Sequence, residues 1–165
     1  MRTVNTLARS VLGGYLAVHG AQKLFGAFGG YGLDGTGGFF ESIGLTPGRE
    51  MAGLAGAAEF GGGILTATGI ADPLGPVTIA GTMAVAAVTH RQAGPLAANG
   101  GFELPVTNLA FAVLAATSSA SAHRLGPRLP NRLAVLAAVG VTVGAAAAIA
   151  KLLTAPTEPT EDAAT

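Results

Sequence analysis

The chain has 165 residues, of which 50% are hydrophobic and only 11% are charged. Soluble domains carry about 25% charged residues, so nine acidic and nine basic side chains would cover too little of a surface facing water. Zero net charge argues against nucleic-acid binding, and the absence of cysteine excludes disulfides, thiolate catalysis and cysteine-ligated metal centres. We therefore expect an all-α integral membrane protein in which residues 1–155 form one transmembrane domain.

Five long segments of the chain are nearly free of charge, and about 20 helical residues are needed to cross a hydrocarbon layer about 30 Å thick. The first segment, residues 4–25, has no small-residue cleavage site after it, so we interpret it as a retained helix rather than a signal peptide. The other four predicted spans are residues 51–71, 73–89, 103–122 and 133–153. Four of the five would form the core of an antiparallel bundle, and the last would add a fifth, C-terminal helix.

The connections between these segments carry their own signals. Residues 26–50 are rich in glycine and form either a disordered loop or one or two amphipathic turns at the membrane interface, begun by a Thr36 cap. Asp72 would cap the helix that follows it, with Pro73 in the first helical position. The polar, acidic residues 156–165 are expected to be disordered.

Two features of the predicted bundle concern its packing and orientation. Small-residue spacing predicts close helix contacts through Gly53, Ala57 and Gly61, and through Gly140 and Gly144.

Basic residues predict how the bundle is oriented in the membrane. With five spans, one side holds Arg2, Arg9, Arg124, Arg128 and Arg132, and the other holds Lys23, Arg49, Arg91 and Lys151. The arginine cluster at the last link favours a cytoplasmic N terminus, an extracytoplasmic C terminus and a multi-pass location in the inner or plasma membrane.

Glu59 is the most informative residue, because it falls near the middle of the second span. A charged side chain at that depth costs about 2.5–3.5 kcal/mol if it faces lipid, so it should face the bundle and be paired, protonated or hydrated. His19, Gln22 and Lys23 share one face at the end of the first span. With a rise of about 1.5 Å per residue, Glu59 lies roughly 12 Å, His19 roughly 9 Å and Lys23 roughly 3 Å below the same membrane rim. We expect Glu59 to meet His19 or Lys23.

His90 and Glu103 bracket the link between the third and fourth spans, in the same outer half of the bundle. Glu59, His19 and Lys23 are therefore the candidate catalytic residues, and Gln22, His90 and Glu103 are the candidate substrate-binding residues. An alternative reading is that the buried pair only locks two helices together and that His90 and Glu103 are ordinary interfacial residues. No HxxxH or ExxH spacing is present, so a metal site is not expected.

Several motifs occur in order along the chain: HGAQKLFG at 19–26, GLTP at 44–47, EFGGGIL at 59–65 followed by Gly69, GGFELP at 100–105, and Gly126-Pro127. In these motifs the sequence resembles the DoxX family of small bacterial and archaeal membrane proteins, over residues 5–130. The chain departs from the family in its fifth span, since members usually have four, and in the stretch RLPNR at 128–132, which replaces the usual ending.

The resemblance implies a role in membrane redox chemistry. Some relatives are a subunit of a thiosulfate:quinone oxidoreductase, others are membrane anchors of an oxidoreductase complex tied to thiol and oxidant stress, and most have no assigned activity. We therefore expect a membrane subunit of a quinone- or thiol/sulfur-linked oxidoreductase complex, with an outward-opening pocket for a quinone or small oxyanion. It would have no intrinsic cofactor, and it would bind redox partner proteins or a second copy of itself. The alternatives are a non-enzymatic anchor or assembly protein, and a small transporter.

Overall fold

The computed structural model describes residues 2–118 and 124–155, and the regular elements in these residues are all helical. Six α-helices follow one another: α1 (Arg2–Phe25), α2 (Gly32–Ser42), α3 (Gly48–Thr68), α4 (Leu74–Thr89), α5 (Glu103–Thr117) and α6 (Asn131–Thr154). Three short 3-10 helices lie in the links: η1 (Ala27–Gly29), η2 (Arg91–Ala93) and η3 (Ala97–Asn99). The predicted all-α fold class is thus confirmed for the part of the chain that the structure describes.

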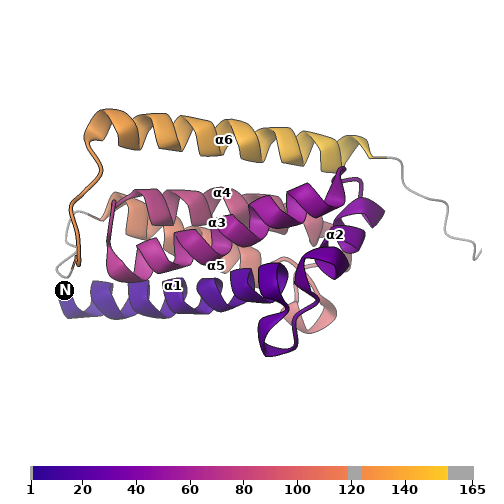
Figure 1. Cartoon of the computed structure of the whole chain (residues 1–165), viewed down its shortest axis with the longest axis horizontal. Coiled ribbons are helices and arrows are strands. Elements are labelled where there is room, and N and C mark those ends of the chain that lie inside the picture. The colour runs from indigo at the N-terminus through magenta and orange to yellow at the C-terminus, as the bar shows by residue number, and fades with distance from the viewer. Residues whose placement is uncertain (1, 119–123, 156–165) are drawn as a thin grey trace, which may run out of the picture.

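The long helices lie side by side with alternating directions (Figure 1). Helix α1 packs on α3, α3 on α4 and α4 on α5, while α5 also touches α1, so these four form the core of the bundle. Helix α2 covers one end of the core, against α1 and α3, and α6 packs along α4 on the outside. We call the end that α2 covers the α2 end, and the end where α1 and α6 begin the N-terminal end.

The predicted segments coincide with helices, but two local predictions are wrong. Residues 26–50 contain the helix α2 rather than a disordered loop, yet Thr36 lies buried within that helix and does not cap it. Asp72 does not cap α4, whose N-cap is Pro73 with no side-chain hydrogen bond, because the Asp72 carboxylate turns toward the bundle interior instead. Helix α5 ends at Thr117, before the predicted boundary. The predicted disordered tail, 156–165, lies outside the described residues.

Glycine brings α1 and α3 close together. A Cβ atom at Gly20 would lie 2.6 Å from the carbonyl oxygen of Gly56, and one at Gly63 would lie 2.5 Å from the carbonyl oxygen of Gly13. These distances leave no room for a side chain, so the two backbones meet at glycines that are seven residues apart on each helix. Small residues allow this approach between helices, and with it dense packing without large side chains.

The predicted glycine contacts are different ones, and they are wrong. A Cβ atom at Gly61, Gly140 or Gly144 would meet no atom within 4 Å, and one at Gly53 would meet only Leu33, at 3.8 Å. Helix α3 carries small residues on several faces, so their spacing alone does not identify the face that meets α1. The two α6 glycines therefore make no close contact with a neighbouring helix within the described residues.

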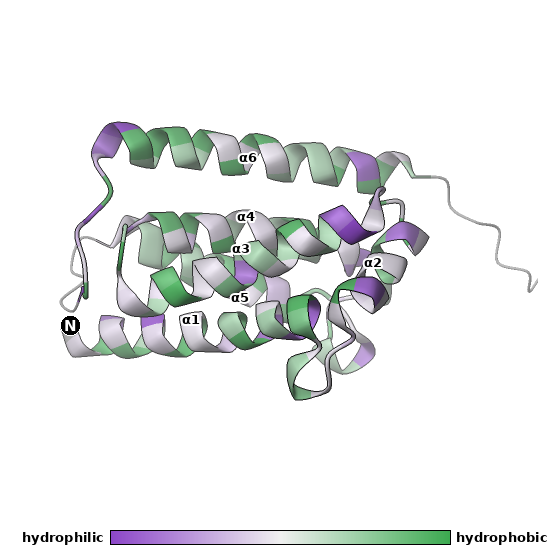
Figure 2. Cartoon of the chain, in the orientation of Figure 1, coloured by the Kyte–Doolittle hydropathy of each residue, from purple (hydrophilic) through white to green (hydrophobic). Residues whose placement is uncertain are grey.

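The outer surface of the bundle is apolar, whereas several buried side chains are polar. Large hydrophobic side chains that are exposed include Val4, Leu7, Val11, Leu54, Phe111, Leu114, Leu136 and Val143, and the buried polar or charged residues are Arg9, Thr36, Glu59, Thr66 and Asp72. Among the described helices, α6 alone is both long and apolar enough to cross a membrane by length and composition, and its most apolar stretch has no buried residue. Figure 2 shows hydrophobic residues along most of α6, with hydrophilic residues at its start and near its end.

Candidate functional site

The centre of the candidate site is an ion pair between α1 and α3. Lys23 Nζ donates a hydrogen bond of 2.5 Å to Glu59 Oε2. Glu59 is only 3% exposed, because α3 places it on the inner face of the helix, whereas the Lys23 side chain is 24% exposed. Gly56, one turn before Glu59, lets the Lys23 stem pass close to α3, since a Cβ atom at Gly56 would lie 3.3 Å from Lys23 Cβ. The predicted meeting of Glu59 with His19 or Lys23 is confirmed for Lys23.

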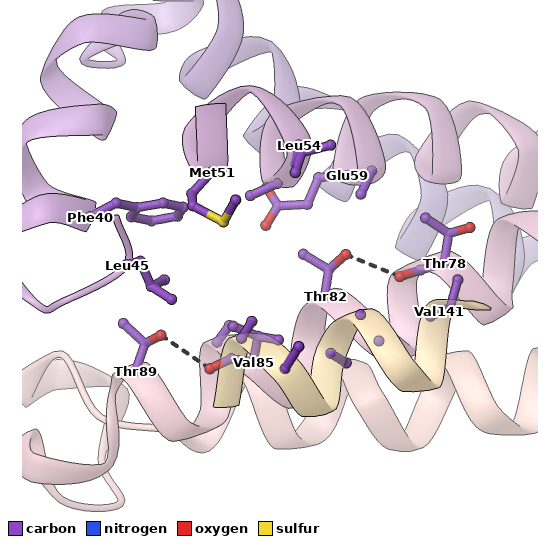
Figure 3. A pocket seen from close by; sticks show the side chains of 18 of the residues that line it. Phe40, Leu45, Met51, Leu54, Glu59, Thr78, Thr82, Val85, Thr89 and Val141 are labelled. Atoms are coloured by element: carbon purple, nitrogen blue, oxygen red, sulfur yellow. Dashed lines mark hydrogen bonds between the residues drawn. The ribbon is translucent and has the colours of Figure 1, made fainter. Parts of the chain in front are cut away.

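Beside this pair lies a cavity of about 570 Å³ between α3, α4 and α6. Figure 3 shows the Glu59 carboxylate pointing into this cavity, with Thr82 of α4 on the facing wall. Most of the remaining lining is aliphatic or aromatic, including Phe40, Leu45, Met51, Leu54, Val85 and Val141, and the ionisable lining residues are Lys23, Glu59, His90 and Lys151. The lining hydroxyl groups of Thr78, Thr82 and Thr89 bond to carbonyl oxygens one turn earlier in α4, so their hydrogen atoms are already committed.

Small side chains leave this cavity unfilled. The α6 wall consists mainly of Gly144, Ala145, Ala147 and Ala148, and the α3 wall includes Ala55 and Ala58. Protein interiors are otherwise close-packed, and natural ligand pockets of about 300–1,000 Å³ combine an apolar lining with a few polar groups. The cavity below α6 has that size and that chemistry.

The structure separates the predicted site residues into two groups. Lys23, Glu59 and His90 line the cavity, whereas His19, Gln22 and Glu103 do not. The His19 ring packs edge-on against Tyr15, with ring centroids 4.5 Å apart. Glu103 Oε2 accepts a 2.9 Å hydrogen bond from the Ala97 amide and so orders the link before α5.

His90 has a partner in the same link. Its Nδ1 lies 2.7 Å from the carbonyl oxygen of Gly100. Because a carbonyl only accepts, this nitrogen carries the proton, and Nε2 is the atom left to interact with a ligand. Within the described residues, no three His, Asp or Glu side chains come together as a metal-binding group.

Sequence reasoning missed a second buried ion pair, at the N-terminal end of the bundle. The Arg9 guanidinium binds the Asp72 carboxylate, and Arg9 also donates to the backbone carbonyl oxygens of Ala115 and Thr66, at 3.0 and 3.4 Å. Arg9 therefore ties together α1, α3, α5 and the α3–α4 turn. From the sequence, Arg9 counts among the orientation signals on one side of the membrane. Its position within a predicted span was the clue that it needed an internal partner.

The sequence model of the DoxX family matches residues 4–92, which is more than half of the chain and covers α2, α3, α4 and all but the first two residues of α1. The chain therefore belongs to the DoxX family, a family of membrane proteins. Both members of the central ion pair lie inside the matched region, while α5 and α6 lie beyond it. The comparison with curated proteins finds no match, and neither does the comparison with solved structures.

The residues at the cavity suit a quinone. A quinone combines a flat, largely apolar ring with two carbonyl oxygens, and its reduction requires protons. The cavity offers an apolar interior, a lysine that donates hydrogen bonds and a carboxyl group that can carry a proton. A ligand with one polar head therefore fits this set of donors, provided that its head reaches Lys23 and Glu59.

Proposed function

We propose that this DoxX-family protein is the membrane subunit of an oxidoreductase complex, and that a quinone or a small oxyanion of thiol or sulfur chemistry binds in the cavity below α6. The observation that carries the proposal is the Lys23–Glu59 pair at the wall of an otherwise apolar, unfilled cavity. A purely structural ion pair does not require empty space beside it. Intramembrane ionisable residues that face such a space are commonly functional.

The proposal includes a multi-pass arrangement in which α1, α3, α4, α5 and α6 cross the inner or plasma membrane. It is supported by the apolar exterior of the bundle together with its buried charges, a combination suited to lipid rather than water. The N terminus and the link 124–130 lie at the same end of the bundle, where Leu125 donates a backbone hydrogen bond to Thr68. We place that end in the cytoplasm, which puts the α2 end and the C terminus outside.

In the proposed chemistry, each member of the pair has a separate task. Lys23 donates a hydrogen bond to a carbonyl or oxyanion oxygen of the ligand, and its positive charge stabilises negative charge that develops there. Glu59 holds or passes on a proton at its carboxyl group, close to that oxygen. A quinone, when bound, supplies the electron acceptor that the chain itself lacks. The electrons come from a redox partner protein, since a chain without cysteine has no thiol of its own to oxidise.

Affinity purification from mild detergent tests this proposal. The tagged wild-type protein should retain a redox partner protein and extractable quinone, and the purified complex, once its partner protein has been reduced, should pass electrons to an added quinone. In the Glu59→Gln variant the partner should still co-purify, while quinone reduction should fall at least about 100-fold, as expected for loss of a general acid–base group. Unchanged activity in this variant would remove Glu59 from the mechanism.

A second candidate function is that of a membrane anchor without chemistry of its own. It is favoured by one observation, since both buried ion pairs bridge helices and would stabilise the bundle in any case. The same purification separates the two functions. An anchor would hold its partner in wild-type and Glu59→Gln forms alike, with no bound quinone and no difference in activity between them.

A further inference from the structure

We infer that the cavity takes its ligand sideways from the lipid bilayer, between α3 and α6, and that the ligand is a membrane-soluble molecule with one polar head rather than a water-soluble ion. This inference rests on the proposed function in so far as the helices cross a membrane and the cavity binds a redox ligand. Of the two ligand classes in the proposed function, a quinone enters by this route and a small oxyanion does not.

The α2 end of the cavity is covered by contacts between α6 and two links. Lys151 Nζ donates a 2.7 Å hydrogen bond to the carbonyl oxygen of Thr46, and Arg91 donates one of 3.4 Å to that of Leu152. Leu45, on the cavity wall, is almost fully buried beneath this junction. The C-terminal part of α6 is thereby fastened over the cavity, and a path from the water at this end would have to break these contacts.

The N-terminal end is closed by packing and by backbone hydrogen bonds. The Val141 side chain of α6 fills the space above Gly81 of α4, where a Cβ atom would collide with Val141. Further along, the link before α6 is bonded to the α3–α4 turn. The Leu125 and Leu129 amides donate to the carbonyl oxygens of Thr68 and Asp72, and the Ala71 amide donates to that of Pro127, all at 2.9–3.0 Å. Helix α6 is therefore held at both ends.

The side between α3 and α6 remains open. Helix α6 packs along α4, and a substantial α3–α6 contact is absent from the described residues. Four residues that line the cavity are exposed. Lys151 lies at the α2 end, in the contact with Thr46, whereas Leu54 on α3, 65% exposed, and Gly144 and Ala147 on α6 lie at this opening. This rim is apolar, so an alkyl chain crosses it readily, whereas an oxyanion would lose its hydration without compensation.

The position of the ion pair fits a ligand that arrives from this side. The cavity extends along α6 from Val141 to Lys151, about 15 Å at the rise of an α-helix. Glu59 projects into the cavity from the wall formed by α3, the helix at the opening, and Lys23 lines the same cavity, so a polar head that has passed the rim can reach both. The aliphatic remainder of the cavity is left for an apolar tail.

A groove on the other side of α6 provides a matched control. It lies between α4, α5 and α6, has about 430 Å³ and is lined by alanine, valine, glycine, threonine and isoleucine, with no ionisable residue. Ala146 lines this groove and its neighbour Ala147 lines the cavity, and both are exposed. Replacing either by phenylalanine adds the same bulk to the same helix, but only Ala147→Phe narrows the proposed opening.

The first arm of the test uses lipid alone. The chain has no tryptophan, so a Val85→Trp variant places a single fluorescent reporter on the cavity wall formed by α4. In nanodiscs of phospholipids with brominated acyl chains, which quench indole on contact, the reporter should be quenched. Quenching should fall at least twofold with Ala147→Phe and stay unchanged with Ala146→Phe. The sideways opening is overturned if Ala147→Phe and Ala146→Phe leave the Val85→Trp reporter equally quenched, or if brominated lipid does not quench the Val85→Trp protein at all. Either result holds whether or not a quinone binds.

The second arm uses two quinones with the same ring, one carrying a ten-carbon tail and one without a tail. The tailed quinone, supplied in the bilayer, should quench the Val85→Trp reporter saturably, and Ala147→Phe should slow this quenching at least about tenfold relative to Ala146→Phe. Equally fast, saturable quenching by the tail-less, water-soluble quinone overturns access from the bilayer. If brominated lipid quenches the reporter but neither quinone does, the proposed quinone ligand is refuted, and the sideways opening to the bilayer is retained.

Discussion

The Lys23–Glu59 pair allows a quantitative test, because its two members are buried to different degrees. Glu59 is 3% exposed, so the Lys23→Met variant would leave a carboxylate buried without a partner. Removing one member of a buried pair costs about 3–5 kcal/mol, and we expect Lys23→Met to lie in that range. Glu59→Gln should cost less, about 1–3 kcal/mol, because the Lys23 side chain is 24% exposed and its flexible stem can move the ammonium toward the membrane surface.

The double variant Lys23→Met/Glu59→Gln leaves no unpaired charge. Its loss of stability should therefore be smaller than the sum of the two single losses, by a coupling free energy of at least about 2 kcal/mol, within the range for residues in direct contact. Unfolding of the purified protein in mixed micelles with increasing sodium dodecyl sulfate measures all four forms. A coupling below about 0.5 kcal/mol, the level of independent sites, would refute the reasoning that the pair is buried and mutually dependent.

Four further predictions concern the second ion pair, the glycine contact and the C terminus. Asp72→Ala should destabilise the bundle by about 3–5 kcal/mol in the same assay, because it strands the buried Arg9. Arg128→Gln should change stability by less than about 1 kcal/mol, since Arg128 is 48% exposed and lies 3.7 Å from Asp72. Gly13→Ala would place a Cβ atom 2.6 Å from the Ala67 amide nitrogen and should cost about 1–3 kcal/mol, whereas Gly14→Ala meets nothing within 4 Å and should stabilise by about 0.5–1 kcal/mol; equal unfolding midpoints would contradict the glycine contact. A C-terminal alkaline phosphatase fusion should be active, and fluorescence of a C-terminal green fluorescent protein fusion would reverse the proposed orientation.

The helices and the central ion pair could be predicted from the sequence because each depends on distances along the chain. Long uncharged segments identify helices, and the rise per residue places Glu59 at nearly the depth of His19, within reach of the long Lys23 side chain. The choice of Lys23 over His19 could not be predicted, because both lie on one face of α1. In the structure the His19 ring packs against Tyr15, and the longer Lys23 side chain reaches Glu59.

The cavity and the second ion pair could not be predicted for a different reason. The cavity exists because α6 packs along α4 and leaves the side toward α3 open, and an evenly apolar helix gives no sequence signal for the neighbour it selects. Arg9 and Asp72 are 63 residues apart in the sequence and each had a local explanation, as an orientation signal and as a helix cap. Arg9 and Asp72 meet in the folded chain because burying either charge without a partner would cost several kcal/mol, about 3–5 kcal/mol for a broken buried pair.

The most direct test of the proposed function is photolabelling of the intact protein in nanodiscs with a photoreactive quinone that carries a short alkyl tail. We expect the label within residues 51–59 of α3 or 78–89 of α4, the stretches that contribute most of the cavity lining from these two helices. An excess of unlabelled quinone should protect these residues, and Glu59→Gln should reduce the labelling. Labelling confined to the outer faces of α1 and α5, or labelling that neither competitor nor Glu59→Gln changes, would contradict a quinone site at the Lys23–Glu59 pair.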